Sequence, residues 1–224
     1  MLTLVIGDKN ISSWSLRPWL ALKMTGVPFA ERMIRLRVPG SSATSAVYRP
    51  GLKDDLKAVN AAGKVPVLID GAVKVWESLA ICEYLAERFP EANLWPQVYD
   101  KRAIARAVAS EMHAGFGNLR RELTMDVVGR HPGKAVSDGA KADIARVVEI
   151  WAECRAANAE AGPFLFGGFT IADAFFAPVV TRFHTYGVEL PASAQAYADA
   201  VLDLAPMREW CAAAEAEVAA GARA

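Results

Sequence analysis

The chain has 224 residues, of which 53% are hydrophobic and 22% charged, and its 25 basic and 25 acidic side chains give a formal net charge of zero. This apolar content supports a sizeable core and excludes a disordered chain. The balanced charge makes nucleic acid and anionic membranes poor candidates for a partner. The apolar run at the N-terminus is too short to span a membrane and lacks a basic leader, so we expect a cytoplasmic protein.

Cysteines and histidines carry no metal pattern. Cys82, Cys154 and Cys211 are far apart and odd in number, which argues against a disulfide framework or a zinc site and fits a reducing compartment. The three histidines lack metal-ligand spacing, and no glycine-rich phosphate loop is present. We therefore expect no metal site.

The first ninety or so residues mix strand and helix patterns. Leu2–Ile6 is a short apolar run that predicts a buried strand. Residues 15–25 carry apolar side chains at helical spacing and then meet a glycine and a proline, which predicts a helix. Alternating residues over 34–38 predict a second strand. Residues 39–58 lack periodicity, and we expect them to be irregular.

A hairpin and a helix follow. Val65–Ile69 and Ala72–Val75 are β-rich runs separated by Asp-Gly, a typical hairpin turn. Residues 78–88 have the apolar spacing of a helix. The order strand, helix, strand, hairpin, helix is typical of a thioredoxin-like half-domain.

The rest of the chain is helical in pattern. We therefore divide it into an α/β thioredoxin-like N-terminal domain over 1–88, a proline-containing linker over 89–99, and an all-α C-terminal domain over 100–224. The expected helical stretches of the second domain are 100–128, 138–161, 170–186, 193–204 and 206–219.

The stretch N-I-S-S-W-S-L-R-P-W at 10–19 places three serines where the first helix begins. Pro18 lacks a backbone N–H and suits a first turn, so we expect the N-cap near Ser15. Ser12 and Ser13 would then lie in the loop before the helix, where free N–H groups favour an anion. A hydroxyl there can donate to a thiolate and lower the thiol pKa. The alternative is that the serines only satisfy turn and cap groups.

Two further segments suit a peptide-like ligand. A cis bond between Val65 and Pro66 would leave the Val65 N–H and C=O free to pair with an extended peptide, although cis is a minority state of X–Pro bonds in general. At the start of the next helix, Ser78 can bind an α-carboxylate and Glu77 an ammonium group. An ordinary helix cap is the alternative for these two residues.

These segments resemble those of the glutathione S-transferase family, in order and over essentially the whole chain. S-S-W-S-L-R-P-W-L-A-L is similar to the serine-type active-site segment of the zeta and theta-like classes. N-A-A-G-K-V-P-V-L resembles the cis-proline segment, and E-S-L-A-I-C-E-Y-L the γ-glutamyl-binding segment. F-T-I-A-D-A-F-F-A-P is similar to the family's capping box. The resemblance implies the glutathione transferase fold, with the active site between the two domains.

The resemblance also implies an activity. Glutathione would be the co-substrate, and its thiol would be activated as a thiolate for attack on a small, mainly apolar electrophile in a homodimeric enzyme. A glutathione-dependent isomerase of the maleylacetoacetate type, a peroxidase and a non-catalytic ligand-binding protein are the alternatives. Trp14 stands where the zeta class has a cysteine, which argues against the isomerase.

Residue roles follow from the same resemblance. Ser12 is the expected catalytic hydroxyl, with Ser13 in reserve. Glutathione is expected to bind through Lys64, the Val65 backbone, Glu77 and Ser78, with Lys64 at the glycyl carboxylate.

The fourth helix of the family faces the groove, and it suggests an electrophile pocket. Met112 and Phe116 are four residues apart, and His113 borders them. We name these three residues and Trp14 as candidate lining, with a packing role as the alternative for His113.

Three residues are expected to be structural. Pro66 begins a strand, and Thr170 with Asp173 forms a capping box. Arg17, one turn beyond the serines, either adds positive potential to the site or serves as a surface or dimer contact.

Overall fold

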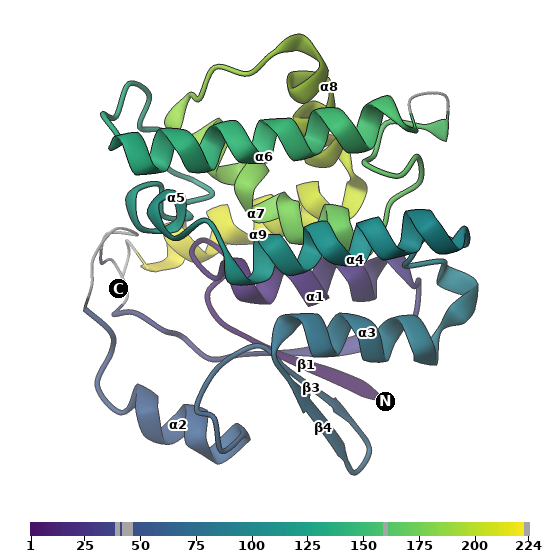
Figure 1. Cartoon of the computed structure of the whole chain (residues 1–224). Helices are drawn as coiled ribbons and strands as arrows, with labels where there is room; N and C mark the ends of the chain where they lie inside the picture. Colours follow the sequence, from purple (N-terminus) through teal and green to yellow (C-terminus); the bar gives the residue numbers. More distant parts are fainter. Residues whose placement is uncertain (39–40, 42–46, 159–160, 222–224) are drawn as a thin grey trace.

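The computed structural model describes residues 1–38, 41, 47–158 and 161–221, and its first part is a four-stranded sheet with helices around it (Figure 1). The sheet has the order β2-β1-β3-β4. Strand β1 runs parallel to β2 and antiparallel to β3, and β3 and β4 form a hairpin. This confirms the thioredoxin-like half-domain. Its elements are β1 (Leu2–Ile6), α1 (Ser13–Met24), β2 (Phe29–Met33), α2 (Leu52–Val59), β3 (Val67–Asp70), β4 (Val73–Trp76) and α3 (Ser78–Arg88).

Strand β1 is buried on both faces, which explains its continuous apolar run. Successive side chains of a strand point to opposite faces. Leu4 and Ile6 therefore pack into the large core with α1 and α3, whereas Val5 packs with residues of α2 in a smaller cluster. Two layers of helix thus cover the sheet.

The second part of the chain is helical in the residues that the structure describes (Figure 1). Helix α7 lies at its centre, with every residue buried except His184. It packs against α1, α4 and α8, so α1 joins the sheet to the helical part. The elements are η1 (Pro90–Ala92), α4 (Tyr99–Ala114), α5 (Gly117–Glu122), α6 (Asp138–Ala156), α7 (Ile171–Tyr186), α8 (Ala192–Asp203) and α9 (Ala205–Gly221).

The predicted capping box is present at the start of α7. The Asp173 Oδ2 atom accepts from the Thr170 backbone N–H at 2.8 Å and from the Thr170 hydroxyl at 3.1 Å. Its Oδ1 atom accepts from the Leu165 N–H and the Tyr197 hydroxyl. Thr170 and Asp173 are therefore structural, as expected.

Two N-terminal predictions are wrong. The second strand is Phe29–Met33 and not 34–38, because the chain leaves the sheet once the Ile34 N–H has bonded to the Ile6 carbonyl. The segment 39–58 is not irregular throughout, since α2 begins at Leu52. Its apolar positions form one short face against the sheet. Residues 39–40 and 42–46 of that segment lie outside the described residues.

Three helix boundaries also differ from expectation. The stretch 100–128 breaks after Ala114, and α5 ends at Glu122. Phe116 has a φ of 61°, which a continuing right-handed helix does not allow. The stretch 138–161 ends at Ala156 in α6, and residues 159–160 lie outside the described residues.

Helix α1 begins two residues earlier than predicted. Ser12 is the N-cap, and its carbonyl accepts from the N–H groups of Ser15 and Leu16. Ser15 is therefore inside the helix, and Pro18 lies in the second turn rather than the first. Proline removes one hydrogen bond there without ending the helix.

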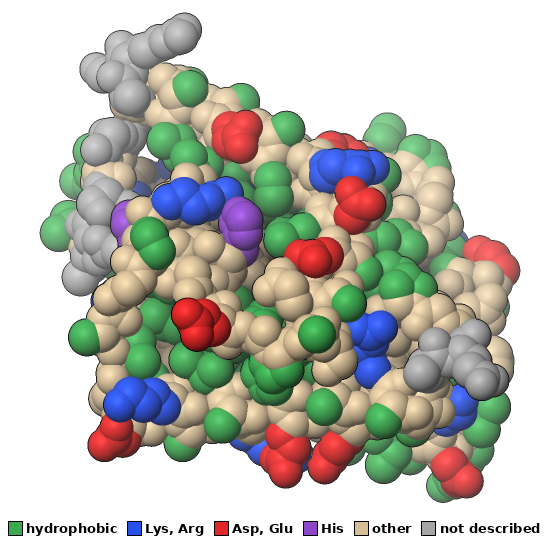
Figure 2. Space-filling model, turned by 90° about the horizontal axis from the view of Figure 1, so that it is seen from above, with side chains coloured by type: hydrophobic (Ala, Val, Ile, Leu, Met, Phe, Trp, Pro, Cys, Tyr) green, Lys and Arg blue, Asp and Glu red, His purple; other side chains and the backbone are tan. Residues whose placement is uncertain are grey.

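Charged side chains of both signs share the surface of the molecule (Figure 2). Figure 2 shows acidic and basic side chains interspersed over one face of the molecule. No helix in the described part of the chain combines the length and apolar character needed to cross a bilayer. The same described residues contain no cluster of His, Cys, Asp and Glu that could hold a metal ion.

Candidate functional site

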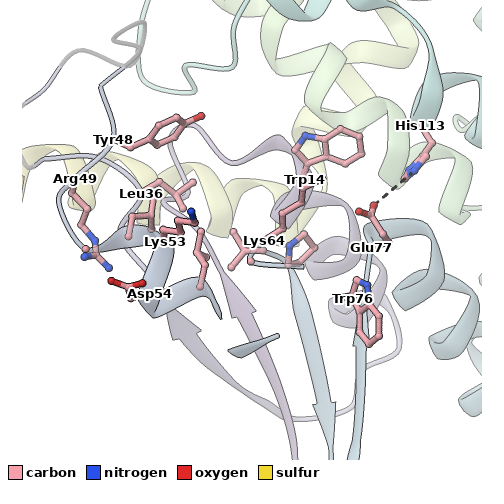
Figure 3. Close-up of a pocket in the computed structure, with 16 residues that line it drawn as sticks. Trp14, Leu36, Tyr48, Arg49, Lys53, Asp54, Lys64, Trp76, Glu77 and His113 are labelled. Atoms are coloured by element: carbon pink, nitrogen blue, oxygen red, sulfur yellow. Dashed lines mark ion pairs between the residues drawn. The ribbon is translucent and has the colours of Figure 1, made fainter. Parts of the chain in front are cut away.

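A cleft of about 890 Å³ opens between the α/β part and α4 (Figure 3). Trp14 at the start of α1 and His113 on α4 lie toward one end, close to Glu77, and Tyr48 and Arg49 lie toward the other. The cleft brings together six residues that the sequence singled out: Trp14, Lys64, Val65, Pro66, Glu77 and His113. Further lining residues that the sequence did not reveal include Leu36, Tyr48, Arg49, Lys53, Asp54 and Trp76.

The loop before β3 is held by its own hydrogen bonds. The Val65–Pro66 bond is cis. The Asn60 side-chain amide donates to the Lys64 carbonyl at 2.7 Å, and the Gly63 N–H donates to the Asn60 carbonyl at 3.0 Å. These contacts hold the Lys64 and Val65 backbone on the cleft wall.

Glu77 and Ser78 lie at the turn from β4 into α3. Glu77 is the N-cap and has a φ of 70°, a conformation rare for residues other than glycine. Its carboxylate reaches the cleft, and its Oε2 atom lies 3.9 Å from the His113 Nε2 atom (Figure 3). Strained backbone of this kind is concentrated at functional sites.

Ser78 is the first residue of α3 and is almost fully buried, yet its hydroxyl has no hydrogen-bond partner among the described residues. Buried polar groups are nearly always paired. The helix start also leaves backbone N–H groups unpaired. The N-terminus of α3 therefore offers a ready donor set for an anion.

The three serines of α1 occupy different environments. The Ser12 hydroxyl donates to the Ser15 Oγ atom at 2.8 Å, and Ser15 Oγ accepts from the Gly7 N–H at 3.0 Å. Ser15 thus ties α1 to the end of β1. Ser12 and Ser13 are both 6% exposed, and neither lines the cleft.

Aromatic rings form the wall nearest α4. Trp14 and His113 meet edge to face with ring centroids 5.3 Å apart, and the His113 ring lies 6.0 Å from that of Phe175. Burial and the nearby Arg17 charge lower the pKa of His113, which favours the neutral imidazole. The structure places the other two candidates, Met112 and Phe116, in the hydrophobic core and not on the cleft wall.

The expectation that Arg17 is a surface or dimer contact is wrong, because its side chain is fully buried. Its guanidinium carbon lies 4.2 Å from the centre of the Trp14 ring. The sequence carried no signal for this burial, since arginine is rarely found fully inside a protein.

Two sequence comparisons decide the family. Residues 11–88 match the model described as glutathione S-transferase, N-terminal domain, and residues 134–213 match the model of the C-terminal domain. Together they span more than half of the chain. The chain belongs to the glutathione S-transferase family.

Relatives place this family member near the zeta and theta classes. Maleylacetoacetate isomerase of Rattus norvegicus is 28% identical over 81% of the chain and 78% of its own length. A bacterial zeta-class maleyl pyruvate isomerase is 25% identical, with a TM-score of 0.69 over 94% of the chain and 97% of its own. A theta-class transferase of Xanthomonas axonopodis pv. citri, solved with glutathione, is 26% identical, with a TM-score of 0.63 over 94% and 96%. Other alignments, with plant transferases among them, cover only 28% to 61% of the relatives' length.

Proposed function

We propose that this family member binds glutathione in the cleft and activates its thiol for attack on a small electrophile. The observation that carries the proposal is that the loop ending in cis Val65–Pro66 and the Glu77 carboxylate meet on one cleft wall. The buried, unpartnered Ser78 hydroxyl follows Glu77 directly, at the start of α3. The glutathione-bound theta-class structure supports the choice of ligand.

Each part of glutathione has a complementary group. The γ-glutamyl ammonium pairs with Glu77, and the α-carboxylate accepts from the Ser78 hydroxyl and N–H. The backbone of Val65 pairs with the cysteinyl residue of the peptide. Lys64 attracts the glycyl carboxylate by charge.

The chemistry needs a stabilised thiolate rather than a nucleophile from the protein. A free cysteine thiol has a pKa of about 8.5, so a lowering by one or two units multiplies the thiolate population at neutral pH. The Ser12 hydroxyl supplies this stabilisation by turning from Ser15 Oγ to the sulfur, with Ser13 as the reserve donor. The thiolate then forms a C–S bond, and the displaced group leaves the electrophile.

Both parts of the chain contribute in this proposal. The domain over 1–88 holds glutathione, the linker is 89–99, and the domain over 100–224 supplies the wall that faces the electrophile. Isomerisation on the same site is the second candidate, supported by the relation to rat maleylacetoacetate isomerase. An activity panel of glutathione with an aryl halide, a hydroperoxide and maleylacetone separates the two from a peroxidase.

The binding proposal is tested by calorimetry with glutathione on Glu77→Ala. This variant leaves the ligand ammonium unpaired, so we expect the dissociation constant to rise about tenfold to a hundredfold, equivalent to ~1.5–3 kcal/mol. Glu87→Ala is the matched control, because Glu87 is an exposed carboxylate on the same helix. Equal affinity for all three proteins would refute the assignment of Glu77.

A further inference from the structure

The strongest unexplained feature of the interior is the Arg17 guanidinium. Arg17 is 0% exposed, and none of its three guanidinium nitrogens has a hydrogen-bond partner among the described residues. A buried cation without a partner costs several kcal/mol. Burial accordingly lowers the pKa of Arg17 well below its ordinary value. An anion that paired with this guanidinium would offset that cost.

Among the residues that the structure describes, no anion pairs with the Arg17 guanidinium. The guanidinium carbon of Arg17 lies 4.2 Å from the Trp14 ring centre and 4.7 Å from that of Phe175. Aromatic faces compensate a cation only in part. Glu77, the carboxylate that acts on Arg17 electrostatically, points into the cleft toward His113. Burial raises the pKa of the Cys82 thiol, which therefore stays neutral.

Two other arginines add to the positive charge. Arg120 and Arg182 both lower the pKa of Arg17. The Arg120 guanidinium lies 5.0 Å from the Trp14 ring centre, and Arg182 is 4% exposed. Arg120 donates to the carbonyls of Gly115 and His113, and Arg182 to that of Pro178. These carbonyl contacts satisfy N–H groups without neutralising either charge.

Trp14 connects this positive interior to the cleft. Its indole is part of the cleft wall beside His113 (Figure 3). The same ring stacks on the buried Arg17 guanidinium. A rotation of the Trp14 side chain would therefore expose Arg17 to a ligand at the end of the cleft that the electrophile occupies.

We propose that the second substrate carries a carboxylate, which displaces the Trp14 ring and pairs with the Arg17 guanidinium. The planar guanidinium matches a carboxylate bidentately, and Trp14 and Phe175 suit an aromatic or unsaturated body beside it. This inference rests on the proposed function and changes its substrate class. The mainly apolar electrophile becomes an acid with an apolar body.

The test compares two electrophiles of similar shape, one anionic and one neutral: 4-chloro-3,5-dinitrobenzoate and the corresponding benzamide. In both reactions the glutathione thiolate forms a C–S bond at the chlorinated carbon, and chloride leaves. We measure kcat/KM for each, corrected for the uncatalysed rates. Arg17→Met should reduce the preference for the acid over the amide by about tenfold to a hundredfold relative to wild type.

Two controls give the result its meaning. Glutathione affinity should be unchanged in Arg17→Met, whereas a loss of glutathione binding would assign Arg17 to glutathione and overturn the inference. Arg182→Met is the matched control. It removes another buried guanidinium, but not the one that stacks on the Trp14 ring, so it should change the preference less. Equal losses in the two variants, or equal losses for acid and amide in Arg17→Met, would also overturn it.

A second measurement needs only the wild-type protein. The glutathione conjugates of the acid and the amide are compared by calorimetry, and the acid conjugate should bind at least about tenfold more tightly. Equal or weaker binding of the acid conjugate contradicts the inference. If glutathione itself binds and the acid is not preferred, only this inference fails. If glutathione does not bind, the proposed function fails as well.

Discussion

At the scale of single residues, the three serines of the opening stretch are chemically alike but differ in their contacts. Ser15 is fully buried, and its hydroxyl bridges Gly7, just after β1, to Ser12. Ser12 is the N-cap, and its hydroxyl donates to the Ser15 side chain instead of accepting from a backbone N–H of the first turn. Ser13 is the first helical residue. Their contacts therefore suggest three separable roles.

Replacement of Ser12 by alanine should lower turnover and leave glutathione affinity nearly intact. A hydrogen bond to the sulfur is stronger once the thiol is ionised, so its loss raises the thiol pKa in the complex. Thiolate absorbance against pH measures that pKa directly. Ser13→Ala should have a much smaller effect, and Ser15→Ala should lower the free energy of unfolding by about 1–2 kcal/mol. A raised thiol pKa in Ser13→Ala alone would move the catalytic role to Ser13.

At the scale of elements, the start of α7 shows how one side chain organises several backbone segments. The Asp173 carboxylate accepts from Leu165, from Thr170 twice and from Tyr197. Despite these four donors, burial dominates and raises the pKa of Asp173 to about 6. The folded protein therefore binds this proton more tightly than the unfolded chain between about pH 4 and pH 6.

The sign of this shift gives a pH prediction. The contribution of Asp173 to stability is fully present below about pH 4 and is lost as the pH rises through 6. The free energy of unfolding of wild type, relative to that of Asp173→Asn, should therefore fall by up to ~3 kcal/mol from pH 4 to pH 7. Chemical denaturation at several pH values measures it. The exposed Asp199→Asn is the control, and a difference that grows with pH would contradict the prediction.

At the scale of the whole molecule, large apolar side chains remain exposed on both parts of the chain. Trp76 on β4 is 49% exposed, and Tyr99 and Ile104 on α4 are 76% and 53% exposed. Strand β4 is also an edge strand of the sheet. Exposed apolar groups and an open sheet edge are both typical of a surface that a partner covers.

We therefore expect a homodimer through this surface. Light scattering at micromolar concentration should give twice the chain mass of 24.1 kDa. Ile104→Asp should shift the protein toward the monomer, because a buried carboxylate is costly at an apolar interface. Val218→Asp, at an exposed valine of α9, should not. A wild-type mass of one chain would rule out the dimer.

Local patterns of the sequence determined much of the architecture by themselves. Strand β1, the hairpin, α3 and the capping box of α7 follow from apolar runs, turn residues and helix-start residues that are close in the sequence. Lys64, Val65 and Glu77 were also identified from short motifs, because a cis-proline loop and a helix start each carry a local signature. The structure places all three on one cleft.

Tertiary packing decided the rest. Pairing with β1 places strand β2 at Phe29–Met33, whereas the alternating pattern of the sequence covers residues 34–38. Arg49 and Lys53 reach the cleft only because α2 folds beside the loop before β3. Met112 and Phe116, on either side of the end of α4 at Ala114, pack in the core. Arg17 is buried beneath Trp14 and beside α7. Burial depends on which distant segments meet, and no local spacing records that.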